Sequence, residues 1–314
     1  MHNMKRVKTA VIGAGYLGTI HARIYSELEC AELVGIVDID RAKGLDVAER
    51  YNARYFENID DVIGLVDAVS ITVPTSDHLK VSMPFIKKGK GLLIEKPLAH
   101  SIEAAKKIIS EAEMHNSLIQ VGHLERFNPV INYVRDKIRE PMFVEFMRIG
   151  PFAGRGTDVD VIMELMIHDL DLINYLIGQD IVSIDAIGIP VLTDKTDIVN
   201  ARIVFKNGCR ANLIASRIST KKERRIRIFQ KDGYYNLDMI NQEGMFLFRQ
   251  KNDSGISVSE RKLEIIKGEP LKLELKSFLE SIKDSRKPAV SGLDGLKALE
   301  LSDRLNSSLF IPKI

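Results

Sequence analysis

Cysteine is scarce in this sequence, and long apolar runs are missing from it. Cys30 and Cys209 are the only cysteines among 314 residues, too few for a disulfide framework or a cysteine-rich zinc site. Such cysteine use is typical of a reducing compartment, so we expect a cytoplasmic protein. No uncharged apolar run is long enough to span a bilayer, and the basic start MHNMKRVKTAVIGAGYLG reaches its glycines too early for a signal peptide. We therefore expect no membrane partner.

The sequence also lacks an excess of charge of either sign. It contains 45 Lys and Arg against 43 Asp and Glu, a formal net charge of +2. Because no global field would attract nucleic acid or an anionic membrane, any anion binding must be local. The stretch KKERRIRIF, residues 221–229, has no interleaved exposed aromatics, so we interpret it as one charged face of a strand and expect no nucleic-acid partner.

Two periodicities divide the chain. From Lys8 to about Gly122, short apolar runs rich in β-forming residues alternate with amphipathic helical stretches, which is typical of a doubly wound parallel sheet. After Gly122 come a helix near residues 130–139, the strand MFVEFMRIG, the helix MELMIHDLDLINYL, and strands separated by turn formers such as KNG and KDG. We predict an α/β protein: a parallel sheet in residues 1–122, and an α/β domain with a large, mostly antiparallel open sheet in residues 123–314. The last helix is expected to pack back on the first domain.

A glycine-rich turn follows the first apolar run. In Gly13-Ala14-Gly15-Tyr16-Leu17-Gly18, the first glycine permits a tight turn, the second lets the backbone approach a pyrophosphate, and the third lets a helix pack closely on the strand. The helix N-terminus adds unpaired N–H groups and partial positive charge. Asp38 ends the next strand, 20 residues after Gly18, where a carboxylate can bind both ribose hydroxyls and would repel a 2′-phosphate. The turn therefore predicts a dinucleotide site that prefers NAD to NADP.

A lysine stands where the fifth predicted strand ends. In IEKP, residues 94–97, the carboxyl end of a parallel strand borders the crevice that binds ligands, so Glu95 and Lys96 should point towards the cofactor. A lysine at a strand end is otherwise a common solvated surface group. The position of Lys96 alone therefore does not distinguish a functional lysine from a surface lysine.

The glycine turn, Asp38 and EKPLAHSIEAAKKI together resemble the Gfo/Idh/MocA family of oxidoreductases, and the likeness covers essentially the whole chain. The resemblance implies a Rossmann domain, a second α/β domain whose open sheet mediates homodimer or homotetramer formation, and an active site between them. It implies NAD(P)-dependent interconversion of a sugar or cyclitol hydroxyl and a ketone. The family's E-K-P lysine corresponds to Lys96. Its helix motif D-x-x-x-H-x-x-D corresponds to Glu164, His168 and Asp171, with Glu in place of the usual first Asp.

The candidate site residues form two sets. The cofactor-binding set comprises Gly13, Gly15, Tyr16, Leu17, Gly18, Asp38, Pro74, His78, Glu95 and Lys96. The substrate-binding set comprises Lys96, His123, Arg126, Phe127, Arg148, Arg155, Glu164, His168 and Asp171.

Helical spacing groups the ionisable residues of MELMIHDLDLINYL. Four residues are spaced at i, i+4, i+7 and i+11, so an α-helix would place them along one stripe of its surface: Glu164, His168, Asp171 and Tyr175. A self-satisfied buried network and a metal site are alternatives, but no second histidine motif supports a metal, and we expect none. With the dinucleotide turn and Lys96, catalysis is the better interpretation.

The chemistry assigns a role to each of these residues. His168 is the candidate general base or acid, because an imidazole titrates near neutral pH. Lys96 would stabilise negative charge on the reacting oxygen or relay the proton, Glu164 would orient His168 or a neighbouring hydroxyl, and Asp171 would support them.

Further segments concern the substrate. Three segments resemble one branch of the family, the UDP-N-acetylglucosamine 3-dehydrogenases: VGHLERFNP at residues 121–129, the segment that contains Arg148 and Arg155, and NLIASRISTKKERRIRIF. That branch implies NAD-dependent oxidation of the sugar 3-hydroxyl, with an aminotransferase taking the keto product in the lipid A precursor pathway. The arginines suit diphosphate or carboxylate recognition, or are ordinary surface charge. Alternatives are a dehydrogenase of another sugar, nucleotide sugar or inositol, an NAD-dependent glycosidase, and a nonenzymatic NAD(H) sensor.

Overall fold

The computed structural model describes residues 6–154, 159–178, 180–252 and 255–312. Packing divides these residues into two compact units. The first unit contains the described residues up to Leu124 together with Pro270–Leu299, and the second contains Glu125–Glu269 and the described residues from Glu300. The domain limits inferred from the sequence stay a prediction.

The first unit is built on a six-stranded parallel sheet, with the order β3-β2-β1-β4-β5-β6. Every residue of β4 and β5 is buried, as expected for strands with helices on both faces. The order reverses at β1 and β4, and ligands of such sheets bind beyond the strand ends at this reversal. The strands are β1 Val7–Ile12, β2 Ala31–Val37, β3 Arg54–Phe56, β4 Ala68–Ile71, β5 Gly91–Glu95 and β6 Ile119–Gly122.

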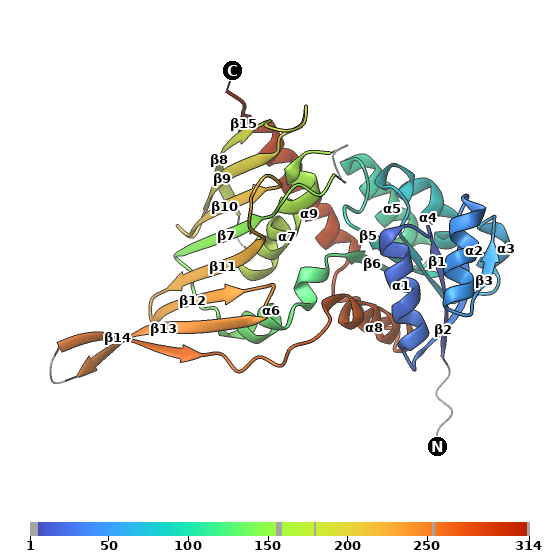
Figure 1. The fold of residues 1–314 in the computed structure, drawn as a ribbon, viewed down its shortest axis with the longest axis horizontal. Helices are drawn as coiled ribbons and strands as arrows, with labels where there is room; N and C mark the ends of the chain where they lie inside the picture. Colours follow the sequence, from blue (N-terminus) through green and yellow to red (C-terminus); the bar gives the residue numbers. More distant parts are fainter. Residues whose placement is uncertain (1–5, 155–158, 179, 253–254, 313–314) are drawn as a thin grey trace. The chain divides into compact units, whose positions relative to one another are not determined.

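Helices cover this parallel sheet (Figure 1). Six α-helices lie wholly within the described part of the unit: α1 Tyr16–Glu27, α2 Arg41–Arg50, α3 Asp60–Ile63, α4 His78–Ile86, α5 Ile102–Met114 and, from near the chain end, α8 Pro270–Lys283. Leu275, Phe278 and Leu279 of α8 join the core that α1 and β1 form. The Rossmann architecture predicted from the sequence is confirmed.

The second unit is built on a nine-stranded mixed sheet with the order β14-β13-β12-β11-β7-β10-β9-β8-β15. Neighbours are antiparallel except for the pairs β7–β10 and β8–β15, which are parallel. The prediction of a mostly antiparallel sheet is confirmed. Its strands are β7 Phe143–Ile149, β8 Ile181–Ile189, β9 Ile198–Phe205, β10 Arg210–Ser216, β11 Glu223–Gln230, β12 Gly233–Asp238, β13 Glu243–Asn252, β14 Gly255–Lys262 and β15 Leu309–Phe310.

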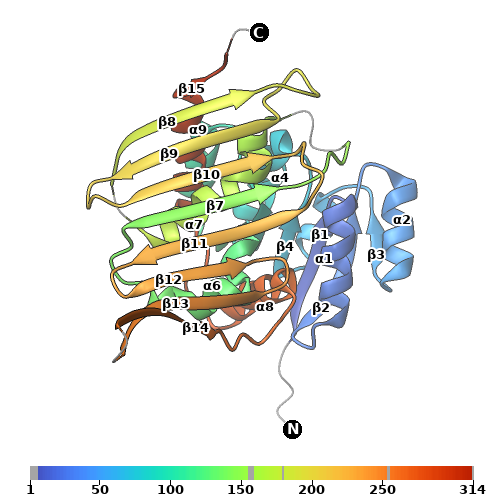
Figure 2. The ribbon, with the colours of Figure 1, turned by 60° about the vertical axis from the view of Figure 1, so that its left-hand side comes forward.

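One face of this sheet carries the core of the second unit. Its buried residues pack against helices α6 (Pro129–Val134) and α7 (Ile167–Leu176) and against Leu301 and Leu305 of α9 (Gly292–Ser307). In Figure 2 no described helix lies over the opposite face. Side chains therefore alternate along the strands, as in β7, between the core and this open face.

Two helices differ from the sequence prediction. The helix expected near residues 130–139 is the short α6 followed by a 3-10 turn at Arg135–Lys137. The helix expected from Met163 begins instead as a π-helix, η4 (Ile162–Met166), which continues into α7. The wider π turn shifts the angular positions of residues on either side of it, and such turns are frequent at functional sites.

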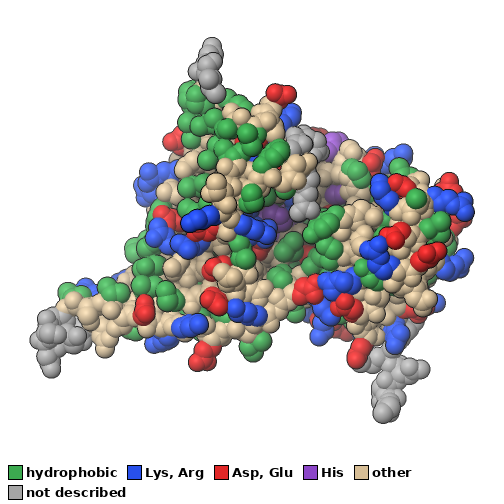
Figure 3. Space-filling view, in the orientation of Figure 1, with side chains coloured by type: hydrophobic (Ala, Val, Ile, Leu, Met, Phe, Trp, Pro, Cys, Tyr) green, Lys and Arg blue, Asp and Glu red, His purple; other side chains and the backbone are tan. Residues whose placement is uncertain are grey.

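The surface shown in Figure 3 mixes charges of both signs. Lys and Arg lie among Asp and Glu on this face of each unit, in keeping with the nearly balanced composition. Among the helices in the described ranges, none has the length and apolar character needed to cross a membrane.

Candidate active site

The glycine turn between β1 and α1 is shaped by close backbone contacts. Gly13 has φ +101°, and a Cβ there would lie 3.0 Å from the backbone of Thr72. A Cβ on Gly18 would lie 1.8 Å from the carbonyl oxygen of Gly13. A Cβ on Gly15 would meet nothing within 4 Å, and Gly15 caps α1 without a side-chain hydrogen bond. The turn thus combines tight packing at two glycines with open space and helix N–H donors at the third.

Asp38 is fixed beside this turn. Its carboxylate accepts hydrogen bonds from the backbone N–H of Ala14 at 2.5 Å and of Asp40 at 2.7 Å. A carboxylate has about four acceptor positions, so two bonds leave capacity for ribose hydroxyls. Tyr16 is two-thirds exposed next to the turn, and Leu17 is half-buried. These residues fit a dinucleotide: the helix N-terminus suits its pyrophosphate and Asp38 suits its ribose.

Glu95 holds the end of β5 through a buried network. Its carboxylate contacts Nε2 of His21 at 3.1 Å and accepts the backbone N–H of Lys96 at 3.3 Å. On its other side, Nδ1 of His21 lies 3.0 Å from Oγ of Ser70, which also contacts the hydroxyl of Tyr25. Burial opposes ionisation of Glu95, but His21 and Lys96 outweigh it and lower the pKa of Glu95. An ionised Glu95 therefore anchors the backbone at Lys96, whose side chain is half-buried.

Pro74 and His78 lie beyond the end of β4. Pro74 is exposed at the start of a 3-10 turn, whereas His78 is 1% exposed. The His78 ring contacts the carbonyl oxygens of Val73 and Pro97, each at 3.1 Å. Burial lowers the pKa of His78, so the neutral ring braces the segment that follows Lys96.

In the second unit, an arginine holds Asp171 on helix α7. Arg126 donates to Asp171 through two nitrogens, at 2.6 and 2.8 Å, and both side chains are buried. The same guanidinium lies 4.5 Å from the ring centroid of Tyr175, a cation–π distance. His168, one turn before Asp171, is 9% exposed. The contacts of Asp171 thus position the helix that carries His168.

Arg148 lies in a second buried ion cluster. Its guanidinium binds both oxygens of Asp169 at 2.7 to 3.1 Å and donates to Glu125 at 2.9 Å. Burial raises the pKa of Asp169 despite these bonds. Burial opposes ionisation of Glu125, but Arg148 and Arg224 outweigh it and lower the pKa of Glu125. The arginine expected to recognise substrate therefore already binds two carboxylates and is 3% exposed.

Glu164 contacts Arg217, an arginine that carries no signal of function in the sequence. Arg217 lies 3.3 Å from Glu164 and donates from Nε to Asp197 at 2.7 Å. Asp197 is buried, and it also accepts the backbone N–H groups of residues 191–193. Glu164, Arg217 and Arg148 line one cavity of about 230 Å³. The longer arm of Glu164 thus reaches an arginine held from β10.

The remaining predicted residues have other surroundings. His123 and Phe127 are buried, at 1% and 8% exposure, and Arg155 lies outside the described residues. No group of three or more His, Cys, Asp or Glu that could hold a metal is present in the described ranges. The roles of Glu125 and Arg217 could not be predicted from nearby sequence. Glu125 binds Arg148, 23 residues away, and Arg217 binds Glu164, 53 residues away.

Family models match both units. Residues 7–123 match the oxidoreductase family with an NAD-binding Rossmann fold, and residues 152–236 match the Gfo/Idh/MocA C-terminal domain. A UDP-N-acetylglucosamine 3-dehydrogenase of Acidithiobacillus ferrooxidans is 36% identical over 94% of this chain and 95% of its own length. The chain belongs to the Gfo/Idh/MocA family. It is therefore an oxidoreductase, and its first unit is the NAD-binding domain.

The chain is also similar to a solved structure and to a more distant member of the Gfo/Idh/MocA family. The solved structure of UDP-N-acetylglucosamine 3-dehydrogenase GnnA from A. ferrooxidans superposes with a TM-score of 0.92 at 34% identity, covering 98% of each chain. A myo-inositol 2-dehydrogenase of Thermotoga maritima is 26% identical over 96% of each chain. The family resemblance stated from the sequence is confirmed.

Proposed function

We propose that this Gfo/Idh/MocA protein oxidises the 3-hydroxyl of UDP-N-acetylglucosamine with NAD⁺ to the 3-keto sugar. The observation that carries the proposal is the 36% identity, over nearly the full length of both chains, to a relative with that name. A second candidate, oxidation of an inositol, has support from the T. maritima relative at 26% identity. A nonenzymatic sensor would need neither Lys96 nor His168.

The first unit binds the cofactor. The N–H groups at the start of α1 would bind its pyrophosphate, for which the open side of Gly15 leaves room. Asp38 would accept hydrogen bonds from the ribose hydroxyls and would disfavour a 2′-phosphate, so NAD is preferred. When bound, NAD⁺ supplies the acceptor for the hydride that leaves the sugar carbon.

The chain's own residues handle the proton and the charge. His168 removes the proton from the reacting hydroxyl and returns it in the reverse direction. Lys96 donates a hydrogen bond to the reacting oxygen and stabilises its developing negative charge. Glu95 keeps Lys96 in position through its backbone N–H, at 3.3 Å. Glu164, held by Arg217 at 3.3 Å, orients a neighbouring substrate hydroxyl.

The proposed setting follows from the same reaction. A cytoplasmic location agrees with the free thiols Cys30 and Cys209. The open face of the nine-stranded sheet is the proposed surface for a homodimer or homotetramer. An aminotransferase would take the 3-keto product towards a lipid A precursor.

An NADH absorbance assay with UDP-sugars, free sugars and inositols tests the proposal. We expect a signal with UDP-N-acetylglucosamine, together with a keto sugar equimolar with NADH in product analysis. Sugar cleavage without net NADH would indicate glycosidase chemistry instead. A signal only with inositols or free sugars would overturn the substrate assignment.

A further inference from the structure

The cavity beside Glu164 is lined by cations at the ends of three central strands of the nine-stranded sheet. It has a volume of about 230 Å³, and its charged lining comprises Arg148, Arg217, Lys222, Arg224 and Glu164. Four cations and one carboxylate thus belong to the described lining of the cavity. Three further carboxylates contact these cations from outside the lining: Glu125, Asp169 and Asp197. An anion is therefore suited to the cations that these carboxylates compensate least.

The strand topology explains why these cations meet. β7 and β10 are neighbouring parallel strands, so Arg148 near the end of β7 and Arg217 just after β10 lie at the same end of the strands. β11 is antiparallel to β7 and begins at that end, which brings Lys222 and Arg224 to it. Residues that are distant in sequence therefore converge on one side of the fold.

Arg148 and Arg224 are direct neighbours across β7 and β11. Like charges in such cross-strand positions repel each other. Glu125 contacts both guanidinium groups, at 2.9 and 3.2 Å, and compensates part of this repulsion. Burial and the charge of Arg148 together lower the pKa of Arg224. A bound anion would stabilise the pair further.

The cations differ in how far their charge is already compensated. Arg148 binds Asp169 and Glu125 through all three of its guanidinium nitrogens and is buried. Among the described residues, Arg224 binds a carboxylate only through Nη1, which donates to Glu125. Its side chain is 36% exposed, and a guanidinium has five N–H donors. Lys222 is exposed and forms no ion pair with any residue in the described ranges. Lys222 and Arg224 are thus the cations best able to bind an added anion.

We propose that this cavity binds the diphosphate of a nucleotide sugar, with Lys222 and Arg224 as its direct ligands. This inference rests on the proposed function and locates one part of the substrate. A diphosphate offers several charged oxygens, which suit a guanidinium fork together with an ammonium point charge. Glu164, on the same cavity wall, is four residues before His168, so the sugar would extend from the diphosphate towards that helix. Neutral inositols would gain nothing from these cations.

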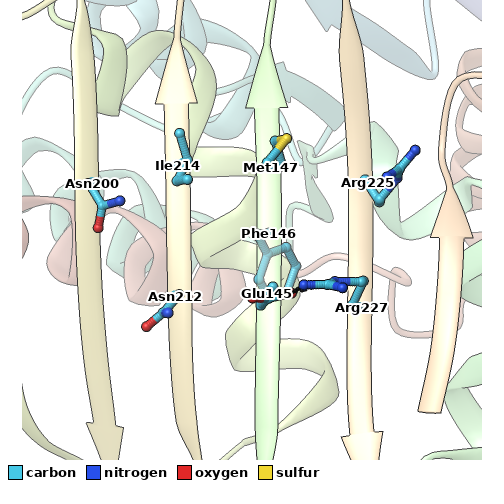
Figure 4. Close-up of a pocket in the computed structure, with 8 residues that line it drawn as sticks. All are labelled: Glu145, Phe146, Met147, Asn200, Asn212, Ile214, Arg225 and Arg227. Carbon is cyan, nitrogen blue, oxygen red and sulfur yellow. Dashed lines mark hydrogen bonds and ion pairs between the residues drawn. The ribbon is translucent and has the colours of Figure 1, made fainter.

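The test compares substitutions of two exposed lysines at the two ends of β11. Lys222→Ala and Lys222→Glu remove or reverse the charge at the cavity. Lys231→Ala is the matched control, because Lys231 is an exposed lysine directly after the other end of the strand. Arg225 is less suitable, because it lines a pocket with Arg227 and Asn200 on the open face that is the proposed oligomer surface (Figure 4). Each protein is assayed for KM and kcat with UDP-N-acetylglucosamine, for KM with NAD⁺, and by calorimetry with UDP alone as the probe.

We expect Lys222→Ala to raise KM for the UDP-sugar about tenfold or more, since a hydrogen bond between charged groups is lost. Lys222→Glu should raise KM for the UDP-sugar further, and UDP affinity should fall in parallel. KM for NAD⁺ and all values of Lys231→Ala should stay unchanged. An unchanged KM and unchanged UDP affinity in both Lys222 variants, or no UDP binding to the wild type, would overturn the diphosphate site. If the wild type turns over inositols but no UDP-sugar, the proposed function fails with it. Turnover of UDP-N-acetylglucosamine that is indifferent to Lys222 would instead remove only the site assignment.

Discussion

The two units build their candidate sites by different means. In the first unit the backbone makes the site: two glycines lie against backbone atoms, a third leaves open space, and backbone N–H groups hold Asp38. In the second unit ion pairs between distant side chains make the site. These pairs are Arg126–Asp171, Arg148–Asp169 and Arg217–Glu164.

The difference determines which substitutions each site tolerates. A backbone site is sensitive to one added methyl group, because a Cβ either collides with a neighbour or fills the space meant for a ligand. A site made of buried ion pairs is sensitive to removal of one partner, which leaves the other charge buried without compensation. The following experiments compare the two units in these terms.

The largest effect is expected at Lys96, the first unit's contribution to the chemistry. Lys96→Met keeps a similar shape and removes the charge, so kcat should fall about 10³-fold or more. The NADH dissociation constant, measured by fluorescence, should stay close to the wild-type value because the glycine turn is untouched. Near wild-type turnover would show that Lys96 has no catalytic role.

A similar loss is expected at His168, on the helix of the second unit. His168→Asn should lower kcat about 10²- to 10⁴-fold, since the group that exchanges the proton is gone. The pH profile of kcat should also lose the limb caused by that base. His115→Asn serves as the control and should leave the profile intact, because His115 is the residue directly after α5, where its ring lies 3.7 Å from Glu111. A variant that keeps the wild-type pH profile would exclude His168 as the base.

The ion pairs of the second unit predict a large cost in stability. Arg126→Met leaves the buried Asp171 carboxylate without its guanidinium and should reduce the free energy of unfolding by about 3–5 kcal/mol. Denaturant unfolding followed by circular dichroism measures this. The exposed pair of Arg50 and Asp46 provides the control, because Arg50→Met should cost at most about 1 kcal/mol. Equal losses in the two variants would mean that Arg126 is no more important than a surface arginine.

Substitutions in the glycine turn should distinguish loss of NADH binding from loss of folding stability. Gly15→Ala meets no protein atom within 4 Å, so it should fold normally but bind NADH about 10- to 100-fold more weakly, because its methyl group occupies pyrophosphate space. Gly18→Ala must displace the carbonyl of Gly13 and should lower the melting temperature as well. If Gly15→Ala bound NADH as the wild type does, the pyrophosphate would not lie at this turn.

The smallest expected effect concerns pH and Asp197. Burial opposes ionisation of Asp197, but backbone N–H groups and Arg217 outweigh it and lower its pKa. A lowered folded-state pKa contributes stability above the unfolded value, about 3.9, and loses it as the pH falls below that value. Wild-type protein should therefore lose more stability than Asp197→Asn when urea midpoints are compared from about pH 6 down to pH 3. Parallel losses would contradict this assignment.

The sequence predicted the backbone site better than the ion-pair site, for a physical reason. The glycine turn and Asp38 are defined by spacing within a single strand-turn-helix-strand unit, so their arrangement follows from local sequence. The helix of His168 was predicted, but its π-helical start at Ile162–Met166 was not. Its partners also escaped prediction, because Arg217 lies 53 residues after Glu164 in the sequence. Only the strand order brings such residues together.

Arg148 illustrates the same limit. Its residue type suggested recognition of a phosphate or carboxylate group of the substrate, and it does line a cavity. Its nitrogens, however, already bind Asp169 and Glu125, which no sequence spacing indicated. The cations best able to bind an added anion, Lys222 and Arg224, belong to residues 221–229, which we interpreted from the sequence as one charged face of a strand.

Isotope transfer is the most direct test of the account. UDP-N-acetylglucosamine carrying deuterium at sugar C3 is incubated with the wild-type enzyme and NAD⁺, and the NADH formed is analysed by mass spectrometry. Oxidation of the 3-hydroxyl predicts that the NADH carries the deuterium and that turnover with the labelled sugar is no faster than with the unlabelled sugar. Unlabelled NADH, or none, would contradict it.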